Sequence, residues 1–120
     1  AERRASGKGR TKSKKRRAEL GLHVLLVDDE EVNRDVGQVY LDRLGCTFTC
    51  LEDGDEVCPT LNAEPEKFDL VMMDVMMKRM NGDAACRELR RSGHTLPVLA
   101  VTGDTQSHRL AQLAEDGFNE

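Results

Sequence analysis

The sequence predicts an α/β domain built on a parallel sheet, and three features of the chain carry this prediction. Two short apolar runs, residues 22–27 and 69–74, both lead to acidic residues, as expected of buried parallel strands that end at one edge of a sheet. Strand-like and helix-like patterns alternate along the chain, which is typical of α/β proteins. A length of 120 residues allows one domain.

The first half of the chain predicts two strand–helix units separated by turn residues. Apolar residues at helical spacing precede Gly45, which favours the end of a helix. Asp53-Gly54 predicts a turn after the second strand. Pro59 is expected to interrupt the second helix near its start, and Pro65 lies beyond its end. The predicted segments are strand 22–27, helix 30–44, strand 46–51 and a short helix around Val57 and Leu61.

The second half predicts two further units, and the chain stops where a fifth strand would begin. Asn81-Gly82 predicts the turn after the third strand, Ser92-Gly93 ends the third helix, and Pro97 opens the fourth strand. The predicted segments are a strand ending at Asp74, a helix around Ala84, Ala85 and Leu89, a strand at 98–102, and a helix around Leu110, Leu113 and Ala114 that finishes near Gly117.

Charge divides the chain into a basic tail and an acidic remainder. Residues 1–21 hold nine basic and two acidic side chains, whereas residues 22–120 hold nine basic and twenty acidic ones. The tail has almost no large apolar residue, so burial cannot offset the entropy of ordering it, and residues 1–21 are predicted to be a disordered linker. Its basic run 14–17 is of the kind that contacts nucleic acid, acidic membranes or nuclear import receptors, but a solvated linker is the simpler interpretation.

Three aspartates are predicted to meet at one edge of the sheet. Asp28 and Asp29 follow the first strand and Asp74 ends the third, and ligands of open α/β sheets bind at the carboxyl ends of strands. Clustered carboxylates repel one another unless a cation lies between them, and oxygen ligands suit Mg²⁺. The sequence therefore predicts a Mg²⁺ site here. An acidic pair on its own would instead be interpreted as a helix N-cap.

Five short motifs occur in order along the chain: Val27-Asp28-Asp29-Glu30, Val32-Asn33-Arg34, Asp74-Val75-Met76-Met77, Met80-Asn81-Gly82 and Thr102. Together they resemble the receiver domain of two-component response regulators, most of all the receivers of hybrid sensor histidine kinases. The resemblance covers residues 22–120. It implies a doubly wound, flavodoxin-like parallel sheet of strand order 2-1-3-4-5, with the fifth strand and last helix absent from this chain and the domain incomplete at its C-terminus.

The resemblance also implies a role for each site residue. Asp74 would be the nucleophile that takes a phosphoryl group from a phosphohistidine and becomes an aspartyl phosphate. Asp29 would bind Mg²⁺ directly, Asp28 largely through water, and the backbone carbonyl of Met76 would be a further ligand. The hydroxyl of Thr102 would hydrogen-bond a phosphoryl oxygen after transfer. Such a domain catalyses its own phosphorylation by positioning and by cationic stabilisation of the transition state.

The chain departs from the family pattern in two places. Lys78 stands where the family commonly has proline. The family also places a lysine at the end of the fifth strand, and the sequence ends at Glu120, before that position. Phosphotransfer is therefore one hypothesis, and the alternative is a receiver-like docking module that binds a kinase or phosphotransfer protein without being phosphorylated.

The resemblance implies a histidine kinase or a histidine phosphotransfer protein as partner, and a kinase domain in the same parent protein is a further candidate. Nucleic acid is not an expected partner, apart from the basic tail. No apolar stretch reaches the roughly 20 residues that a membrane span needs, and the tail lacks a secretory signal. The expected location is the cytoplasm or the cytoplasmic face of a membrane-bound parent, with the nucleus as an alternative from the basic run.

Several other patterns favour ordinary structural roles. All five methionines fall within residues 72–80. Core packing by Met72 or Met73, with Met77 and Met80 at loop positions, is favoured over a Cu(I) site. Four cysteines show no C-x-x-C spacing, and Cys46 and Cys50 share strand parity with Phe48, so they are predicted to face the core. Glycine-rich phosphate loops are missing, which argues against nucleotide binding. A phosphatase of the haloacid dehalogenase type would need an aspartate at position 76. Scattered histidines (His23, His94, His108) match no phosphodonor pattern, and Asp104 is predicted to cap the fourth helix.

Overall fold

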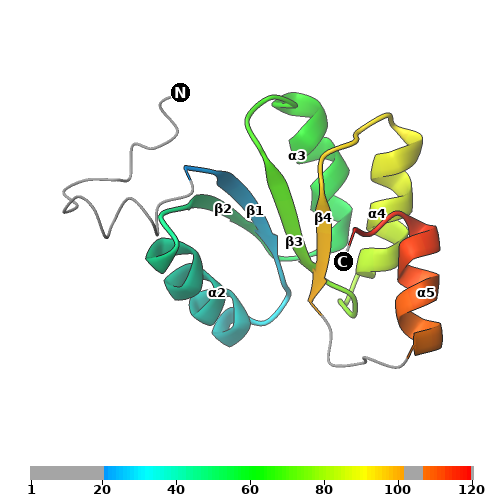
Figure 1. Ribbon diagram of the computed structural model, residues 1–120, viewed down its shortest axis with the longest axis horizontal. Coiled ribbons are helices and arrows are strands. Elements are labelled where there is room, and N and C mark those ends of the chain that lie inside the picture. Colours follow the sequence, from blue (N-terminus) through cyan, green and yellow to red (C-terminus); the bar gives the residue numbers. More distant parts are fainter. Residues whose placement is uncertain (1–20, 102–106, 120) are drawn as a thin grey trace.

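The apolar runs of the sequence form four parallel strands that lie side by side in one sheet (Figure 1). The computed structural model describes residues 21–101 and 107–119. Each strand has four or five residues, rich in Val, Leu, Met and Thr side chains that suit a pleated, largely covered surface. The strands are β1 (His23–Val27), β2 (Thr47–Leu51), β3 (Leu70–Asp74) and β4 (Val98–Val101).

The strand order is β2-β1-β3-β4, which confirms the doubly wound arrangement expected from the sequence. Val27, the last residue of β1, is in register with Leu51 of β2 and with Met73 of β3. Asp74 is in register with Val101, the last residue of β4. All four strands therefore end at the same edge of the sheet, and the residues that follow them gather there.

Helices cover both faces of the sheet, α2 on one face and α3, α4 and α5 on the other (Figure 1). Gly45 and Gly117 have φ values of 78° and 108°, a conformation that favours glycine, and they follow the ends of α2 and α5 as the sequence predicted. The helical segments are α2 (Glu31–Arg43), the 3₁₀ turn η2 (Gly54–Glu56), α3 (Val57–Ala63), α4 (Gly82–Arg91) and α5 (Ser107–Asp116).

Two hydrophobic cores lie on the two sides of the sheet. The larger one joins β1 and β3 to α3, α4 and α5 and includes Leu25, Leu61 and Leu89. The smaller one, on the α2 side, is centred on Val24, Leu26, Leu41 and Cys46, with Phe48 and Cys50 packed against it. Cys46, directly before β2, and Cys50, within β2, therefore both face the core as predicted.

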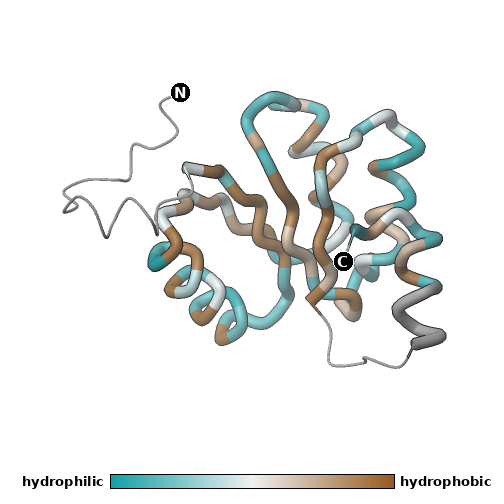
Figure 2. The backbone as a smooth tube through the Cα atoms, in the orientation of Figure 1, coloured by the Kyte–Doolittle hydropathy of each residue, from teal (hydrophilic) through white to brown (hydrophobic). Residues whose placement is uncertain are grey.

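The apolar stripe of α2 forms the predicted helix but is largely exposed. Four of its apolar side chains point to solvent, as does Val101 at the end of β4. Figure 2 shows hydrophobic positions recurring along α2. Of the described elements, only β1 and β2 pack closely on this helix, so much of its apolar stripe lacks a covering layer. The exposed residues of the stripe are Val32, Val36, Val39 and Tyr40.

One local expectation is wrong. Pro59 does not interrupt the second helix, because it is the third residue of α3, in the first turn, where a backbone N–H has no partner within the helix in any case. Two other expectations fall outside the described residues: the disordered tail, except for Gly21, and the structure at Thr102 and Asp104. In the part of the chain that the structure describes, no helix combines the length and apolar character needed to cross a membrane.

Candidate functional site

The three aspartates singled out in the sequence meet at the carboxyl edge of the sheet. Asp28 and Asp29 directly follow β1, and Asp74 is the last residue of the neighbouring strand β3. One carboxylate oxygen from each can be chosen so that all three lie within 4.8 Å of one another. The register of parallel strands, together with the turn after β1, therefore builds a cluster of oxygen ligands of the kind that holds a hard divalent cation.

Asp28 is the most deeply placed member of this cluster, with only 6% of its surface exposed. Its Oδ1 accepts hydrogen bonds from the backbone N–H of Glu30 (3.0 Å) and from Nδ2 of Asn33 (3.4 Å). Arg34 donates from Nη1 to the Asp28 carbonyl oxygen at 2.7 Å. The N-cap of α2 is Glu30, so neither Asp28 nor Asp29 caps the helix. These contacts orient the Asp28 carboxylate toward the sheet edge.

The environment of Asp74 makes its negative charge costly. Burial raises the pKa of the Asp74 carboxyl above its usual range, and the nearby charge of Asp28 raises it further. Backbone N–H groups of Met76 and Val75 act in the opposite direction, and Asp29 adds a smaller upward effect. A carboxylate whose strongest charged neighbours are other carboxylates is stabilised by any cation placed among them.

This charge repulsion predicts how stability depends on pH when divalent cations are removed by a chelator. The pKa of Asp74 is raised in the folded state. The free energy of unfolding therefore decreases as the pH rises from the ordinary aspartate range through the folded pKa, and this decrease is complete at neutral pH. We expect Asp74→Asn, which stays neutral, to melt a few degrees higher than the wild type at pH 7, with the difference vanishing near pH 3. Thermal melts across this range measure it, and equal melting temperatures at pH 7 would contradict it.

The loop after Asp74 is closed on itself by two short hydrogen bonds. The backbone N–H of Gly82 donates to the carbonyl oxygen of Val75 (2.7 Å), and that of Met77 donates to Oδ1 of Asn81 (2.8 Å). A Cβ atom on residue 82 would overlap the carbonyl oxygen of Asp74, so the close approach requires glycine. The Asn81-Gly82 turn predicted from the sequence thus holds the loop against the end of β3.

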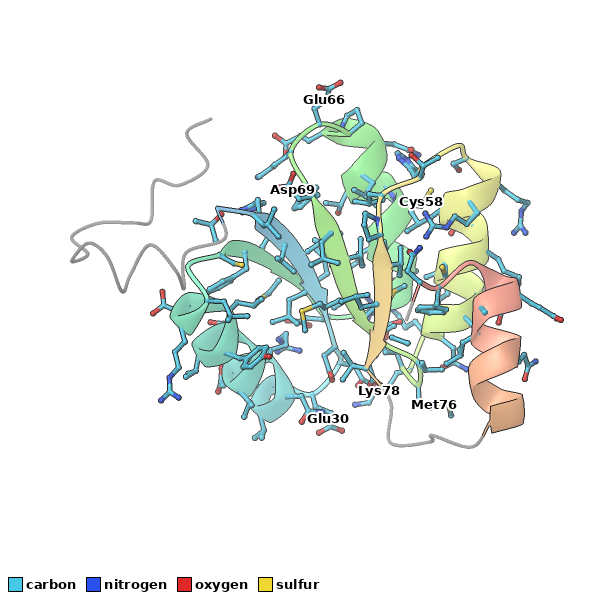
Figure 3. The ribbon with its side chains drawn as sticks, viewed as in Figure 1. Glu30, Cys58, Glu66, Asp69, Met76 and Lys78 are labelled. Atoms are coloured by element: carbon cyan, nitrogen blue, oxygen red, sulfur yellow. The ribbon has the colours of Figure 1, made fainter. Side chains whose placement is uncertain are left out.

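Met76 lies in this loop with its side chain 67% exposed, and Lys78 is exposed as well. Figure 3 shows both residues at the same end of the molecule as Glu30, which precedes α2. Met77 is buried and Met80 packs against the larger core, as does Met73 from β3. The packing role predicted for Met72 or Met73 is confirmed for Met73, whereas Met76 does not pack in the core.

A groove of about 490 Å³ opens beside the carboxylates. Its walls come from β1, β3, β4 and the exposed stripe of α2, so it is mainly apolar with acidic groups at one end. A partner's side chain can approach Asp74 through such an opening. The groove is lined by Leu26, Val27, Asp28, Asn33, Val36, Gly37, Tyr40, Met72, Asp74, Met76 and Val101.

The remaining predicted site residues lie apart from the cluster or outside the description. Thr102 is outside the described residues, and nothing is assigned to the side chain of His108. The ring nitrogens of His23 lie 2.6 and 2.9 Å from the hydroxyl groups of Thr47 and Thr49, and Nε2 of His94 lies 2.8 Å from Oδ1 of Asn62. Both histidines therefore have hydrogen-bonding partners of their own, and His23 begins β1, at the end of the strand opposite Asp28.

The sequence indicated Asp53 only as a turn residue, but in the structure Asp53 also contacts the loop after Asp74. Asp53 is only 1% exposed, and its carboxylate accepts three backbone hydrogen bonds, from Gly54 (2.8 Å), Arg79 (2.9 Å) and Met80 (2.7 Å). An aspartate before glycine signals a turn, but nothing local indicates a partner 26 residues away. Its contact with the loop after Asp74 depends on the fold.

Comparison with known proteins gives a consistent result. The sequence profile of the response regulator receiver domain matches residues 24–120. The transcription factor SKN7 of Saccharomyces cerevisiae is 33% identical over 100 residues, which are 83% of this chain and 16% of SKN7. The CAI-1 autoinducer sensor kinase/phosphatase CqsS of Vibrio cholerae is 32% identical over 100 residues, 81% of this chain and 14% of that protein. The chain thus spans about a sixth or less of the length of these relatives.

Solved structures resemble the fold closely. The receiver domain of the histidine kinase CKI1 from Arabidopsis thaliana, complexed with Mg²⁺ and BeF₃⁻, superposes with a TM-score of 0.71 at 29% identity, covering 82% of this chain and 77% of that one. The co-crystal structure of the phosphotransfer protein Ypd1 with the receiver domain of Ssk1, from Saccharomyces cerevisiae, gives a TM-score of 0.74 at 17% identity, covering 82% and 75%. At 17% identity, the second resemblance shows only that the fold is shared.

Proposed function

Because this chain belongs to the response regulator receiver domain family, which acts in two-component and phosphorelay signalling, we propose that it accepts a phosphoryl group on Asp74. The single observation that carries the proposal is the cluster of Asp28, Asp29 and Asp74, whose ligand atoms lie within 4.8 Å of one another. The donor in this proposal is a phosphohistidine of a histidine kinase or a phosphotransfer protein. The similarity to the sensor kinase/phosphatase CqsS and to the receiver domain of the histidine kinase CKI1 supports a partner of that class.

In the proposed reaction an oxygen of the Asp74 carboxylate attacks the phosphorus atom of the phosphohistidine. A phosphorus–oxygen bond forms, the phosphorus–nitrogen bond breaks, and the released imidazole nitrogen takes up a proton from solvent. The backbone N–H groups that hydrogen-bond the Asp74 carboxylate orient it, and the groove beside it admits the donor side chain. Most of the catalysis in such a transfer comes from positioning and charge stabilisation.

The donor set suits Mg²⁺, because the three carboxylates form a strongly negative cluster of hard oxygen ligands, and the charges of Asp28 and Asp29 raise the pKa of Asp74. Asp29, Asp28 and Asp74 would hold the ion, with the backbone carbonyl of Met76 as a further ligand. A bound Mg²⁺ would neutralise the negative charge that gathers on the phosphoryl oxygens. The Mg²⁺ in the CKI1 receiver structure supports this assignment. Thr102 is proposed to donate to a phosphoryl oxygen after transfer.

Mg²⁺ is expected to raise the melting temperature of the protein. A ligand that binds only the folded state stabilises it by about 2.7 kcal/mol at a hundredfold excess over its dissociation constant. Asp29→Ala should remove most of this shift, even though the loss of one like charge stabilises the metal-free form. Thermal melts with Mg²⁺ and with chelator provide the measurement, and Asp35→Ala, an exposed acid on α2, serves as a matched control. Identical melts of the wild type under both conditions would rule out the metal site.

The alternative function is a docking module that binds a kinase or phosphotransfer protein without being phosphorylated. It is favoured by the large apolar surface of α2 next to the groove. Mg²⁺-dependent labelling with acetyl phosphate separates the two functions. Incorporation of one phosphoryl group supports the first, and stable binding of a phosphotransfer protein without labelling supports the second.

A further inference from the structure

The peptide that joins Met76 to Met77 is held in one orientation by the side chain of Asn81. The N–H of Met77 donates to Oδ1 of Asn81 at 2.8 Å. This peptide bond is trans, so its carbonyl oxygen, which belongs to Met76, points in the direction opposite to the N–H. A contact made by the N–H therefore determines where the Met76 carbonyl points.

Asn81 accepts the hydrogen bond from Met77 instead of the helix-capping hydrogen bond that is usual at its position. It is the N-cap residue of α4, where an asparagine normally accepts a hydrogen bond from the N–H of the second or third residue of the helix. No such capping bond is formed. The side-chain oxygen faces backward onto the loop, so its role concerns the loop after Asp74 more than the start of the helix.

Asp53 holds the other side of the same loop. Its two carboxylate oxygens accept the backbone N–H groups of Arg79 and Met80, the two residues before Asn81. Burial alone would raise the pKa of Asp53, but the N–H donors outweigh it and hold the pKa below the usual range, so the carboxylate is ionised at neutral pH. A Cβ on residue 54 would overlap the carbonyl oxygen of Met80, which shows how closely the two segments approach.

We infer that Asn81 and Asp53 are positioning residues for the cation site, with Asn81 aiming the Met76 carbonyl and Asp53 holding the backbone that carries Asn81. This inference rests on the proposed function, because it concerns the Mg²⁺ that the three aspartates would bind. Neither side chain touches the ion in this assignment. Loss of a residue that orients a metal ligand typically weakens metal binding by roughly 10–100-fold.

The test measures Mg²⁺ affinity directly by calorimetric titration of folded protein. Asn81→Ala should weaken Mg²⁺ binding about tenfold, and Asp53→Ala by a similar factor. Asn81→Asp keeps an acceptor for the Met77 N–H and should restore the wild-type affinity or exceed it. The matched control, Leu61→Val, removes buried volume from α3 and lowers the melting temperature, but it should leave Mg²⁺ affinity unchanged.

Amide hydrogen exchange in the metal-free protein gives a second readout. Because no Mg²⁺ is present, the added charge of Asn81→Asp cannot change this readout through metal binding. The Met77 amide should lose protection in Asn81→Ala and keep it in Asn81→Asp, while the Arg79 and Met80 amides should lose protection in Asp53→Ala. If Asp53→Ala fails to fold, Asp53→Asn replaces it, since the amide keeps one acceptor oxygen and a partial effect is expected.

The outcomes separate this inference from the proposed function. Wild-type Mg²⁺ affinity in Asn81→Ala, with an unprotected Met77 amide, would overturn the positioning role and leave the metal site intact. A wild-type protein that binds no Mg²⁺ would overturn the metal site itself, and the positioning role with it. Equal weakening by Leu61→Val would show that the effect is general destabilisation, which also overturns the inference.

Discussion

Asp74→Asn is expected to abolish the Mg²⁺-dependent transfer of a phosphoryl group from acetyl phosphate to the protein. An amide is a far weaker nucleophile than a carboxylate, and the substitution also removes one of the three negative charges that would hold the cation. Because the acceptor atom itself is lost, the expected effect is complete loss of labelling. Intact-mass measurement after reaction, with and without Mg²⁺, detects a single added phosphoryl group.

Asp35→Asn is the matched control for this experiment. It makes the same chemical change at an exposed position of α2, and it should be labelled like the wild type. Full labelling of Asp74→Asn would mean that another carboxylate is the acceptor. Absence of labelling in both the wild type and the control, together with stable binding of a phosphotransfer protein, would support the docking function.

Arg90→Ala is expected to cause a large loss of stability, although Arg90 belongs to neither hydrophobic core. The guanidinium of Arg90 donates to the carbonyl oxygens of His94 (3.1 Å), Leu96 (2.8 Å) and Gly117 (2.6 Å from Nη2), and to Oδ1 of Asn119 (3.0 Å). Removing it leaves several partly buried acceptors without a partner, a loss on the order of 3 kcal/mol. Urea unfolding at neutral pH measures this change.

The effect should be large because Arg90 organises the contact between α4, α5 and β4. Asn119, one of its acceptors, also accepts a hydrogen bond from the Val98 N–H through Oδ1 (2.7 Å) and donates its own N–H to the Val98 carbonyl (2.8 Å). Arg91 is the neighbouring residue, exposed at the end of the same helix, and Arg91→Ala should change stability by no more than about 0.5 kcal/mol. Equal unfolding free energies for the two variants would show that the Arg90 contacts contribute little.

The sequence by itself determined the fold class and the place of the acidic site. Short apolar runs that end on Asp28 and Asp74 predict buried parallel strands, and the common direction of such strands brings their ends to one edge of a sheet. The order β2-β1-β3-β4 was an expectation from the family resemblance, and the structure confirms it. These features depend on residue type and spacing within a few positions, which a sequence displays directly.

Local sequence also misleads where a residue has more than one use. Pro59 suggests an interruption, yet in the first turn of α3 its missing N–H costs nothing. The stripe from Val32 to Tyr40 has the spacing of a buried helix face, but most of it is exposed because the described elements pack on only part of α2. Propensity and periodicity establish that a helix forms, and the neighbours decide how much of it is covered.

Only the tertiary structure decided what Asp53, Asn81 and Arg90 do. As sequence, Asp53-Gly54 and Asn81-Gly82 are two ordinary turns, and Arg90 is one charge near the end of a helix. In the fold, Asp53 reaches backbone donors 26 and 27 residues away, and Arg90 reaches an acceptor 27 residues away at Gly117. The physical reason is that each of these side chains satisfies backbone groups of a distant segment, and which groups need satisfying is known only once the sheet and helices have packed.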